Sequence, residues 1–485
     1  MEWQSELAKI WNWLVIVLTV VLALLAAGHA VLYRRESRAA VLWVGVIMLV
    51  PLIGATLYFI LGVNRIRRRA ILLRSGLVHM LSVRMPPRAP ADGASQWLPE
   101  DARHLGALAN TVGRVAERPL LRGNQITPLQ NGDEAYPAML AAIESAQHTV
   151  TLSTYIFDRD EAGVTFAKAL GNAVRRGVEV RVLIDATGTR YSWPPILGVL
   201  RKEKVRYARF LPTFPLWRLL SINLRCHRKT LVVDGRIGFT GGMNIRVGHW
   251  HSKNSRHPIQ DLHFRIEGPV VSHLQEVFAE DWLFTTGESL QGKPWFPELD
   301  PAGPAAARAI ADGPDEDPDP LRWTIQAALA AAQRSVKIMT PYFLPDQALI
   351  SSLNLAALRG VRVEIVLPEK NNLHLVAWAS QAMWWQVLDH GCSIFLSAPP
   401  FDHTKLMVVD NHWSLVGSAN WDPRSFRLNF ELDVECYDAT LAGQLTALFD
   451  ARRATAREVT LNQVDGRALL IRLRDGVARL FTPFL

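Results

Sequence analysis

Two segments of the chain carry the same reactive side chains at the same spacing. They read CHRKTLVVDGRIGFTGGMN over residues 226–244 and DHTKLMVVDNHWSLVGSAN over residues 402–420. Each contains the pattern H-x-K-x4-D followed by G-[GS]-x-N, and equivalent positions are 176 residues apart. Two such matches in register, with similar flanks, are not expected by chance and predict a functional site. The reactive members are His227, Lys229, Asp234 and Asn244 in the first segment, and His403, Lys405, Asp410, Ser418 and Asn420 in the second.

The side chains in this pattern suit the cleavage of a phosphodiester. Such a group is anionic and resists nucleophiles, so a site must supply positive charge, a nucleophile and a proton donor together. His and Lys at alternate positions of a strand project to one face, where an imidazole and an ammonium group can meet one phosphate. One histidine would attack phosphorus and the other would donate a proton to the leaving alcohol. The predicted phosphate ligands are both lysines with Asn244, Ser418 and Asn420, and this chemistry requires no metal or other cofactor.

Asp234 and Asp410 complete the two motifs and are candidate catalytic residues on that ground. Each lies five residues beyond its lysine, and on a strand this spacing places the side chain on the opposite face. A structural role, in which the two carboxylates stabilise the architecture through buried pairs, is at least as well favoured as a chemical one.

The rest of the chain is repeated as well. AQHTVTLSTYIF (146–157) resembles AQRSVKIMTPYF (332–343), and RRGVEVRVLID (175–185) resembles LRGVRVEIVLP (358–368). In each copy, amphipathic helical stretches alternate with β-branched runs. This rhythm predicts an α/β fold of two pseudo-symmetric α-β-α sandwich lobes, with one active site at their junction.

Segments without apolar periodicity divide the chain. MPPRAPADGASQWLPED (85–101) is rich in Pro and small residues and indicates a linker, predicted over residues 71–118. A second break over residues 292–303 separates the two copies. We therefore expect the first lobe over residues 119–290 and the second over residues 305–485.

Residues 1–70 are predicted to form a membrane anchor. Two runs without any charged residue, 11–33 and 39–62, are each long enough to cross about 30 Å of hydrocarbon. We expect two transmembrane helices there. Two spans place the segments before and after them on one side of the membrane. These segments hold six basic residues, against three between the spans, so the catalytic part is expected on the cytoplasmic side.

Composition excludes several other classes. Of the net charge of +8, residues 1–69 hold eight Lys or Arg against three Asp or Glu, which leaves only +3 for the other 416 residues. A broad basic surface for nucleic acid is therefore absent, and the expected partner is a membrane. The three cysteines form no C-x-x-C pair. Four histidines between His249 and His263 have no accompanying cysteine, so we expect no metal site there.

The two motifs resemble those of the phospholipase D superfamily, whose members work through a phosphohistidine intermediate. The strings GVNRIRRR, QDLHFRIEGPVV, TPYFLPD and GSANWDPRSFRLNFEL extend the likeness to bacterial cardiolipin synthases along nearly the whole chain. This resemblance implies transfer of a phosphatidyl group from one phosphatidylglycerol to another, giving cardiolipin and glycerol. It also implies a multi-pass protein of the bacterial cytoplasmic (inner) membrane.

Individual roles follow from the same resemblance. It implies that His227 is the nucleophile and His403 the acid, and that each histidine is oriented by a downstream carboxylate, at Asp261 and Glu431. The carboxylate would fix the tautomer and stabilise the imidazolium, as in a Ser-His-Asp triad. The first copy has Gly242 where the second has Ser418, so the two copies are not equivalent at that hydroxyl.

Several alternatives remain open at the level of sequence. A phospholipase D hydrolase would use the same residues but pass the phosphatidyl group to water, and a phosphatidylserine synthase would use serine. From other classes come a membrane-tethered nuclease and an inactive membrane scaffold. The weak charge of the body argues against the nuclease, and the intact His, Lys and Asn of both copies argue against the scaffold. The motifs do not distinguish phosphatidylglycerol from phosphatidylethanolamine as the donor.

Overall fold

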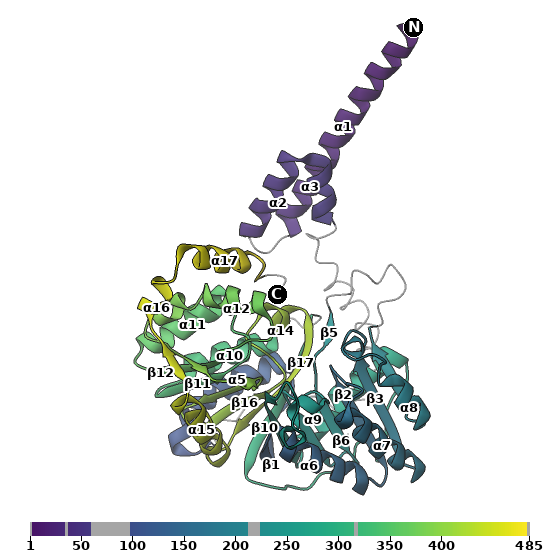
Figure 1. Cartoon of the computed structure of the whole chain (residues 1–485), viewed down its shortest axis with the longest axis vertical. Coiled ribbons are helices and arrows are strands. Elements are labelled where there is room, and N and C mark those ends of the chain that lie inside the picture. The colour runs from purple at the N-terminus through teal and green to yellow at the C-terminus, as the bar shows by residue number, and fades with distance from the viewer. Residues whose placement is uncertain (1, 34–36, 60–97, 212–223, 315–318, 483–485) are drawn as a thin grey trace. The chain divides into compact units, whose positions relative to one another are not determined.

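The chain folds into two units, each described here by itself. Figure 1 shows the computed structural model, which describes residues 2–33, 37–59, 98–211, 224–314 and 319–482. Contacts within the chain separate Met1–Leu72 from Leu73–Leu485. Residues 71–97 of the predicted linker lie outside the described residues.

The N-terminal unit contains three helices, α1 (Glu2–Tyr33), α2 (Ser37–Leu49) and α3 (Pro51–Leu57). Lys9–Tyr33, within α1, is the one helical stretch among the described residues that is long and apolar enough to cross a membrane. Small side chains at helical spacing let the neighbouring helices approach α1 closely. These are Ala23, Ala26, Ala27 and Ala30, which are buried in one cluster with Ile47, Ala55 and Tyr58.

The second predicted membrane helix, over residues 39–62, is wrong as a continuous span. The helix breaks at Val50, and Pro51, which has no N–H to donate, begins α3. α3 lies beside α2, where a Cβ at Gly54 would come within 2.4 Å of the Val46 carbonyl oxygen. With 13 and 7 residues, neither helix alone crosses about 30 Å of hydrocarbon. The described part of the chain therefore has a single candidate span instead of the predicted multi-pass arrangement, and residues 60–62 lie outside it.

Most of the described strands of the C-terminal unit form one large mixed sheet, as predicted for an α/β protein, and two short strands form a separate pair. The order in the large sheet is β18-β13-β12-β11-β15-β16-β17-β10-β1-β9-β7-β6-β2-β3-β4, and the antiparallel pair β1 and β10 joins its halves. The first lobe contains β1 (Leu121–Gln130), β2 (Thr149–Thr154), β3 (Glu179–Asp185), β4 (Tyr207–Phe210), β6 (Thr230–Val233), β7 (Ile237–Gly241) and β9 (Leu262–Glu267). The second lobe contains β10 (Ala305–Asp312), β11 (Ser335–Met339), β12 (Arg362–Pro368), β13 (Ser393–Ser397), β15 (Leu406–Val409), β16 (Trp413–Gly417), β17 (Asn429–Tyr437) and β18 (Arg457–Val459).

Helices cover both faces of this sheet (Figure 1). Those of the first lobe are α6 (Asn131–Ser145), α7 (Glu161–Arg175), α8 (Leu197–Lys202) and α9 (Val271–Thr286). Those of the second lobe are α10 (Pro320–Ala331), α11 (Gln347–Leu358), α12 (His374–Gln381), α13 (Trp385–Leu388), α14 (Pro423–Arg427), α15 (Ala439–Ala454), α16 (Leu461–Asp465) and α17 (Leu469–Leu480).

The equivalent helices α7 and α11 begin and end by the same local chemistry. Asp160 caps α7 by accepting a hydrogen bond from the Gly163 N–H (3.0 Å), and Asp346 caps α11 in the same way. Both helices are followed by a glycine with positive φ, Gly177 at 92° and Gly360 at 89°, which turns the chain into the next strand. The Arg-Gly pairs at residues 176–177 and 359–360 of the repeated sequence therefore end both helices.

The two lobes share part of their hydrophobic core. α9 and α15 lie over one face of the sheet, and their apolar side chains pack in a single cluster with strands of both lobes. Leu274 of α9 and Leu445 of α15, for example, are both fully buried there. Because this core is continuous, the two copies form one rigid body that can hold residues from both lobes in a common site.

The predicted linker over residues 71–118 is too long. Residues 98–116 form a 3-10 turn, η3 (Glu100–Leu105), and helix α5 (Gly106–Ala116). Leu105, Leu108 and Val112 are fully buried in the core of the second lobe, where α5 packs on α10. The apolar spacing of GALANTVGRVA is that of an amphipathic helix, so this segment carried a signal in the sequence.

Three two-residue strands tie the lobes together by a reciprocal exchange. β5 (Arg225–Cys226) of the first lobe pairs with β17 of the second. β14 (Phe401–Asp402) of the second lobe pairs with β8 (Ile259–Gln260) of the first. β5 and β14 directly precede the two motif histidines, so each histidine is carried toward the opposite lobe.

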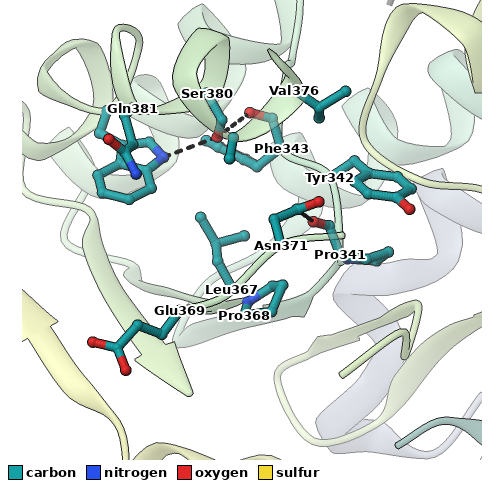
Figure 2. Close-up of a pocket in the computed structure, with 12 residues that line it drawn as sticks. Pro341, Tyr342, Phe343, Leu367, Pro368, Glu369, Asn371, Val376, Ser380 and Gln381 are labelled. Atoms are coloured by element: carbon teal, nitrogen blue, oxygen red, sulfur yellow. Dashed lines mark hydrogen bonds between the residues drawn. The ribbon is translucent and has the colours of Figure 1, made fainter. Parts of the chain in front are cut away.

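The carboxyl ends of β11 and β12 border a small pocket that opens to solvent. Figure 2 shows Tyr342, from the loop after β11, on one side and Glu369 and Gln381 on the other. Helix α12 closes the pocket, and its Ser380 hydroxyl donates to the Phe343 carbonyl oxygen (2.7 Å). Crevices at the carboxyl ends of parallel strands are common ligand-binding positions in α/β folds.

Candidate active site

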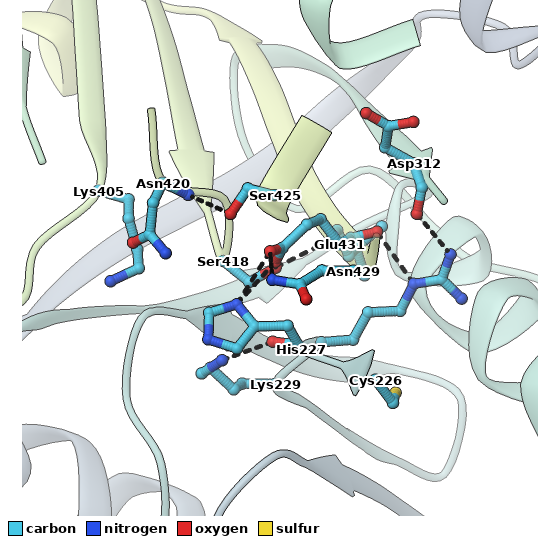
Figure 3. Close-up of polar contacts among 12 residues, drawn as sticks. Cys226, His227, Lys229, Asp312, Lys405, Ser418, Asn420, Ser425, Asn429 and Glu431 are labelled. Carbon is cyan, nitrogen blue, oxygen red and sulfur yellow. Dashed lines mark hydrogen bonds and ion pairs between the residues drawn. The ribbon is translucent and has the colours of Figure 1, made fainter. Parts of the chain in front are cut away.

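The first motif histidine meets a carboxylate of the opposite lobe. His227 Nδ1 lies 2.9 Å and 3.0 Å from the two carboxylate oxygens of Glu431, which is the third residue of β17. The His227 backbone N–H donates to the Phe430 carbonyl oxygen (2.9 Å), so the β5–β17 pairing delivers the ring to its partner. Figure 3 shows Ser418, Asn429 and Glu431 converging on this side of the His227 ring.

The second motif histidine makes the reciprocal contact. His403 Nδ1 lies 2.8 Å from Asp261 Oδ2, and the His403 N–H donates to the Gln260 carbonyl oxygen (2.8 Å). The sequence predicted both carboxylates as orienting groups, and the structure adds that each serves the histidine of the other lobe. A complete site therefore requires both copies.

The two carboxylates receive different support. Glu431 accepts further hydrogen bonds from the Ser418 hydroxyl (2.6 Å) and the Asn429 amide (3.0 Å). Asp261 accepts instead from its neighbour, the Leu262 N–H (2.8 Å). Apart from its histidine, Glu431 thus has two side-chain donors, whereas the described residues provide no such side-chain donor to Asp261.

The first motif has Gly242 where the second has Ser418, because there is no room for a side chain beside Asp261. A Cβ at Gly242 would lie 2.3 Å from Asp261 Oδ1, so no side chain fits there while Asp261 keeps its position. Ser418 donates its only hydroxyl proton to Glu431 and accepts from the Leu432 N–H (3.0 Å). In this arrangement Ser418 supports Glu431, and its predicted role as a phosphate ligand stays a prediction.

The motif lysines lie beside the histidines and are almost completely buried. Lys229 donates to the His227 carbonyl oxygen and Lys405 to that of His403. Each ammonium group has three donors and uses one in this contact, so two remain for an anionic ligand. The Lys229 ammonium also lies 5.8 Å from the centre of the Tyr155 ring.

Burial dominates the protonation of the histidines and carboxylates. It lowers the pKa of His227 to about 4, against the opposing charge of Glu431. Burial also raises the pKa of Asp261 to about 6, against the opposing charge of Lys405. At Glu431 burial is outweighed by the charge and hydrogen bond of His227, so that pKa is lowered. Glu431 is thus firmly ionised at neutral pH, whereas Asp261 holds a proton more readily.

Burial acts on the lysines in the opposite direction. It lowers the pKa of Lys229 to about 7 and that of Lys405 to about 8, although Glu431 and Asp261 oppose the shift. A bound phosphodiester would add negative charge and favour the ammonium forms again. The positive charge of the site therefore depends on pH and on the ligand.

The motif asparagines are buried near these groups. The Asn244 side-chain oxygen accepts from the Ile156 N–H (3.0 Å), which leaves its amide N–H groups for a ligand. The Asn420 N–H donates to the Ser425 hydroxyl (3.1 Å), and its buried side-chain oxygen has no partner among the described residues. Both fit the predicted role in phosphate binding.

Asp234 and Asp410 are not brought to the histidines. Each follows the strand that begins after its lysine, in a turn with a φ of 51° or 52°. Asp234 accepts from the backbone N–H groups of residues 147–149, at 2.7 to 2.9 Å. Asp410 accepts in the same way from residues 333–335 and also from His104 Nε2 (2.7 Å). The geometry fits the structural role and leaves no contact with the site.

Sequence reasoning missed several groups around the histidines. The Tyr155 ring lies 5.3 Å from the His227 ring, and Tyr342 lies 6.3 Å from His403. Both belong to the repeated strings TYIF and TPYF, so the repetition itself was an available signal. The buried His249 ring lies 6.5 Å from His403, although its segment reads as a polar loop. Among the described residues, no three His, Cys, Asp or Glu side chains gather in an arrangement that could hold a metal ion.

Arg228 was also missed, because it stands between two motif residues. It is buried, pairs with Asp281 of α9 at 2.6 Å, and donates to the Glu431 carbonyl oxygen (2.9 Å). The guanidinium thereby fixes β17 to α9 directly beneath the first histidine. Its equivalent in the second motif is Thr404, so this support exists in one half only.

Comparison with known families and relatives gives a consistent result. The family described as cardiolipin synthase, phospholipase D-like domain, matches residues 139–282 and 325–453, and one described as phospholipase D-nuclease N-terminal matches residues 21–62. Cardiolipin synthase 1 of Bacillus anthracis is 31% identical over 93% of this chain and 90% of its own length. Cardiolipin synthase A of Pseudomonas putida is 32% identical over 96% of both chains.

The fold is also found in a solved structure. Phosphatidylserine synthase from Haemophilus influenzae aligns with a TM-score of 0.61, covering 78% of this chain and all of its own, at 15% sequence identity. This likeness concerns the fold alone.

Proposed function

The chain belongs to the cardiolipin synthase family of phospholipase D-like proteins, and we propose that it converts two phosphatidylglycerol molecules into cardiolipin and glycerol. The observation that carries the proposal is the reciprocal pairing of His227 with Glu431 and of His403 with Asp261. It brings two histidines, each oriented by a carboxylate of the other lobe, to one site. Transfer in two steps needs such a pair.

In the first step, His227 acts as the nucleophile. Glu431 holds the ring proton on Nδ1, which leaves the Nε2 lone pair free to attack phosphorus. The bond from phosphorus to the glycerol headgroup of the donor breaks as the P–N bond forms. His403 gives its proton to the departing glycerol oxygen. The lysines and asparagines of both motifs stabilise the charge on the non-bridging oxygens.

In the second step, His403 acts as the base. It takes the proton from the terminal hydroxyl of a second phosphatidylglycerol, whose oxygen attacks phosphorus and displaces His227. The P–N bond breaks, cardiolipin leaves and both histidines return to their starting states. Asp261 supports this role by holding the His403 ring through Nδ1 (2.8 Å), and burial raises the pKa of that carboxyl to about 6.

The pocket beside His403 supports the use of a lipid acceptor. Tyr342 lies against His403 and also lines this pocket, which contains the apolar side chains of Phe343, Leu367 and Val376. An acceptor that places its hydroxyl at His403 can extend apolar groups into this space. Water as the acceptor would give a hydrolase instead, and the residues themselves do not decide this.

We place the enzyme at the bacterial cytoplasmic membrane, with the C-terminal unit on the cytoplasmic side. With α1 as a single span, Lys9 precedes the apolar stretch and Arg34, Arg35 and Arg38 follow it. Positive charge accumulates on the cytoplasmic side of a span. Protease added outside intact spheroplasts is expected to spare the C-terminal unit, and its digestion there would contradict this orientation.

The activity is tested with purified full-length protein in phosphatidylglycerol vesicles. We expect cardiolipin and glycerol in equal amounts by mass spectrometry, and neither with His227→Ala. Phosphatidic acid without cardiolipin would identify a hydrolase. Added serine or phosphatidylethanolamine tests the other acceptor and donor, and cleavage of DNA without lipid products would favour a nuclease.

A further inference from the structure

Helix α17, the last described helix of the chain, exposes a large apolar surface. Leu469, Leu470 and Leu480 are 77%, 79% and 72% exposed. Leu473, Val477 and Phe481 are about half exposed or more. Such a concentration of exposed leucine within one helix is costly in water and marks a contact with something apolar.

The exposed residues occupy one sector of the helix. At about 100° per residue, Leu469, Leu470, Leu473, Val477, Leu480 and Phe481 fall within an arc of about 120°. Asp475 and Ala478, which are buried, lie on the opposite side. In a surface helix the apolar side usually packs on the protein. In α17 the apolar sector faces outward instead, and the packed side includes an aspartate.

The packed side is fixed by specific contacts. Asp475 is completely buried and accepts from Arg467 (2.7 Å) and from its neighbour Arg474 (2.7 Å). Arg467 also donates to the Gln381 carbonyl oxygen of α12 (3.1 Å), and the Arg474 guanidinium lies 4.4 Å from the centre of a Trp378 ring. These bonds hold the helix on α12 in one rotation, so the outward direction of the leucines is built in.

Basic residues stand at both borders of the apolar sector. Arg474 borders it on one side, and Arg472 and Arg479 border it on the other, with all three exposed. The one acidic side chain of the helix, Asp475, is buried and already paired. An apolar sector edged by arginines suits a helix that lies in the plane of a bilayer, with its leucines among the acyl chains and the guanidinium groups of Arg472 and Arg479 at the phosphates.

We propose that α17 docks the C-terminal unit on an anionic phospholipid bilayer. The charge pattern favours this occupant over a second copy of the chain or another protein, because a protein interface has few reasons to place arginines on both borders. The location agrees as well. α12 supports α17 with one side and lines the pocket with Val376 and Gln381 on the other, so docking at α17 would bring that pocket close to the lipid source of the reaction.

Docking is tested with full-length protein in proteoliposomes, where α1 keeps every variant on the vesicle. The natural cysteines, Cys226, Cys392 and Cys436, are all buried, so a cysteine introduced at Leu470 can be labelled selectively with a solvent-sensitive fluorophore. Leu355→Cys on α11, an exposed leucine of the same lobe, is the matched control. In vesicles containing phosphatidylglycerol, bromine-substituted acyl chains should quench the probe at position 470 and leave the probe at position 355 bright.

Charge is tested by Arg472→Glu with Arg479→Glu in the Leu470→Cys background. Reversal of both charges should reduce the quenched fraction by roughly tenfold, because each basic side chain at an anionic surface favours binding by several-fold. The matched control is Lys168→Glu with Lys202→Glu, an exposed basic pair on α7 and α8 of the first lobe, which should leave quenching unchanged. Replacing phosphatidylglycerol by phosphatidylcholine should act like the arginine reversal.

The proposal fails if the probe at position 470 is not quenched by lipid, or if both charge reversals act equally. It also fails if that probe is shielded from an aqueous quencher without being reached by lipid bromine, since a protein partner would then cover α17. None of these readouts requires turnover, so they remain valid whether or not the vesicles accumulate cardiolipin.

Discussion

The two halves of the site are built from the same motif but differ around their carboxylates. In the half of His227, Glu431 accepts hydrogen bonds from Ser418 and Asn429, and its pKa is lowered. In the half of His403, Asp261 has no such side-chain donors, and burial raises its pKa to about 6. A carboxylate held ionised keeps its histidine in one tautomer, while one that titrates near neutral pH lets its histidine exchange a proton.

This difference favours the two roles that we propose. A nucleophile needs a fixed tautomer with a free Nε2, and the donors around Glu431 suit that need. An acid that later becomes a base needs a proton that can be gained and lost, and the weaker support of Asp261 suits that need. Duplication thus supplied two copies of one motif, and the flanking residues at positions 242 and 418 made them unequal.

The largest effect is expected when each histidine is removed in turn. We expect His227→Ala and His403→Ala each to lower cardiolipin synthesis by about 10⁴-fold or more. A phosphatidyl diester of p-nitrophenol, whose leaving group needs no proton, should separate them. His403→Ala should then release about one equivalent of nitrophenolate and accumulate phosphohistidine, and His227→Ala should release none. A burst from His227→Ala alone would reverse the two roles.

The next test removes charge from each carboxylate. Glu431→Gln should lower turnover by about 10³-fold to 10⁴-fold, because an amide can hold the wrong tautomer of His227. Asp261→Asn should cost less, about 10²-fold, and mainly in the step that needs proton exchange. Single-turnover measurements of phosphohistidine formation and decay would distinguish the two steps.

Asp433 provides the control for these changes. It lies two residues beyond Glu431 on β17 and is buried, and burial raises its pKa to about 8. Because this carboxyl is already neutral at pH 7, Asp433→Asn should change turnover by only a few-fold. An equal loss in Asp433→Asn and Glu431→Gln would show that any change on this strand is damaging.

The unequal position in the two motifs gives a third test. Gly242→Ser should lower activity by about 10²-fold, because the new Cβ would lie 2.3 Å from Asp261 Oδ1 and displace it from His403. Ser418→Ala should lower activity by about tenfold, the effect of one hydrogen bond to a charged group. Measurement of kcat and KM for both variants, with circular dichroism to confirm folding, checks this order. A larger loss in Ser418→Ala would mean that the hydroxyl binds substrate.

The pH profile gives a fourth test. Burial lowers the pKa of Lys229 to about 7 and of Lys405 to about 8, so both ammonium groups are lost as the pH rises through this range. We expect kcat/KM to fall by about tenfold per pH unit between these two values and by about a hundredfold per unit above both, where two protons are lost. An arginine at position 229 keeps its charge throughout this pH range. In Lys229→Arg the fall of kcat/KM should therefore begin at a higher pH, near the pKa of Lys405, even if the absolute rate is lower. If kcat/KM of Lys229→Arg falls at the same pH as in the parent, Lys229 is not the group whose deprotonation causes the fall.

Much of this site could be predicted from the sequence, because its members are fixed by local patterns. The two His, the two Lys and the two Asn lie within segments of about twenty residues that repeat. The carboxylates at positions 261 and 431 followed from resemblance to a family. Which carboxylate meets which histidine could not be predicted, since it depends on β5, β8 and β14, strands of two residues that have no periodicity to detect.

Errors in the fold had equally physical causes. Hydropathy detects composition, so the run over residues 39–62 scored as a span although Pro51 breaks its helix. The linker was drawn too long because a Pro-rich segment obscured the start of α5. The hydrogen bond from Ser418 to Glu431 could not be predicted either, because it depends on how close β16 and β17 bring these two side chains.

The smallest effect on turnover is expected at the motif aspartates. Their replacement should instead lower the stability of the protein, by a different amount in each lobe. Asp234→Asn and Asp410→Asn should each leave kcat within a few-fold of normal, because neither side chain contacts the site. Each should lower the unfolding temperature, since an amide cannot accept from three backbone N–H groups as a carboxylate does. Asp410→Asn should lower it more, because Asp410 is fully buried and also bonds His104 of η3.

The pH dependence of stability follows from the same contacts. Burial raises the pKa of Asp410, but the hydrogen bonds from residues 333–335 and His104 outweigh it, so the pKa is lowered. Its contribution is therefore complete above the ordinary aspartate value and is lost as the pH falls below it. Thermal unfolding of both variants and the parent at about pH 7 and about pH 3 should show the difference for Asp410→Asn shrinking at the lower pH. A loss of activity without a loss of stability would instead indicate that these aspartates take part in catalysis.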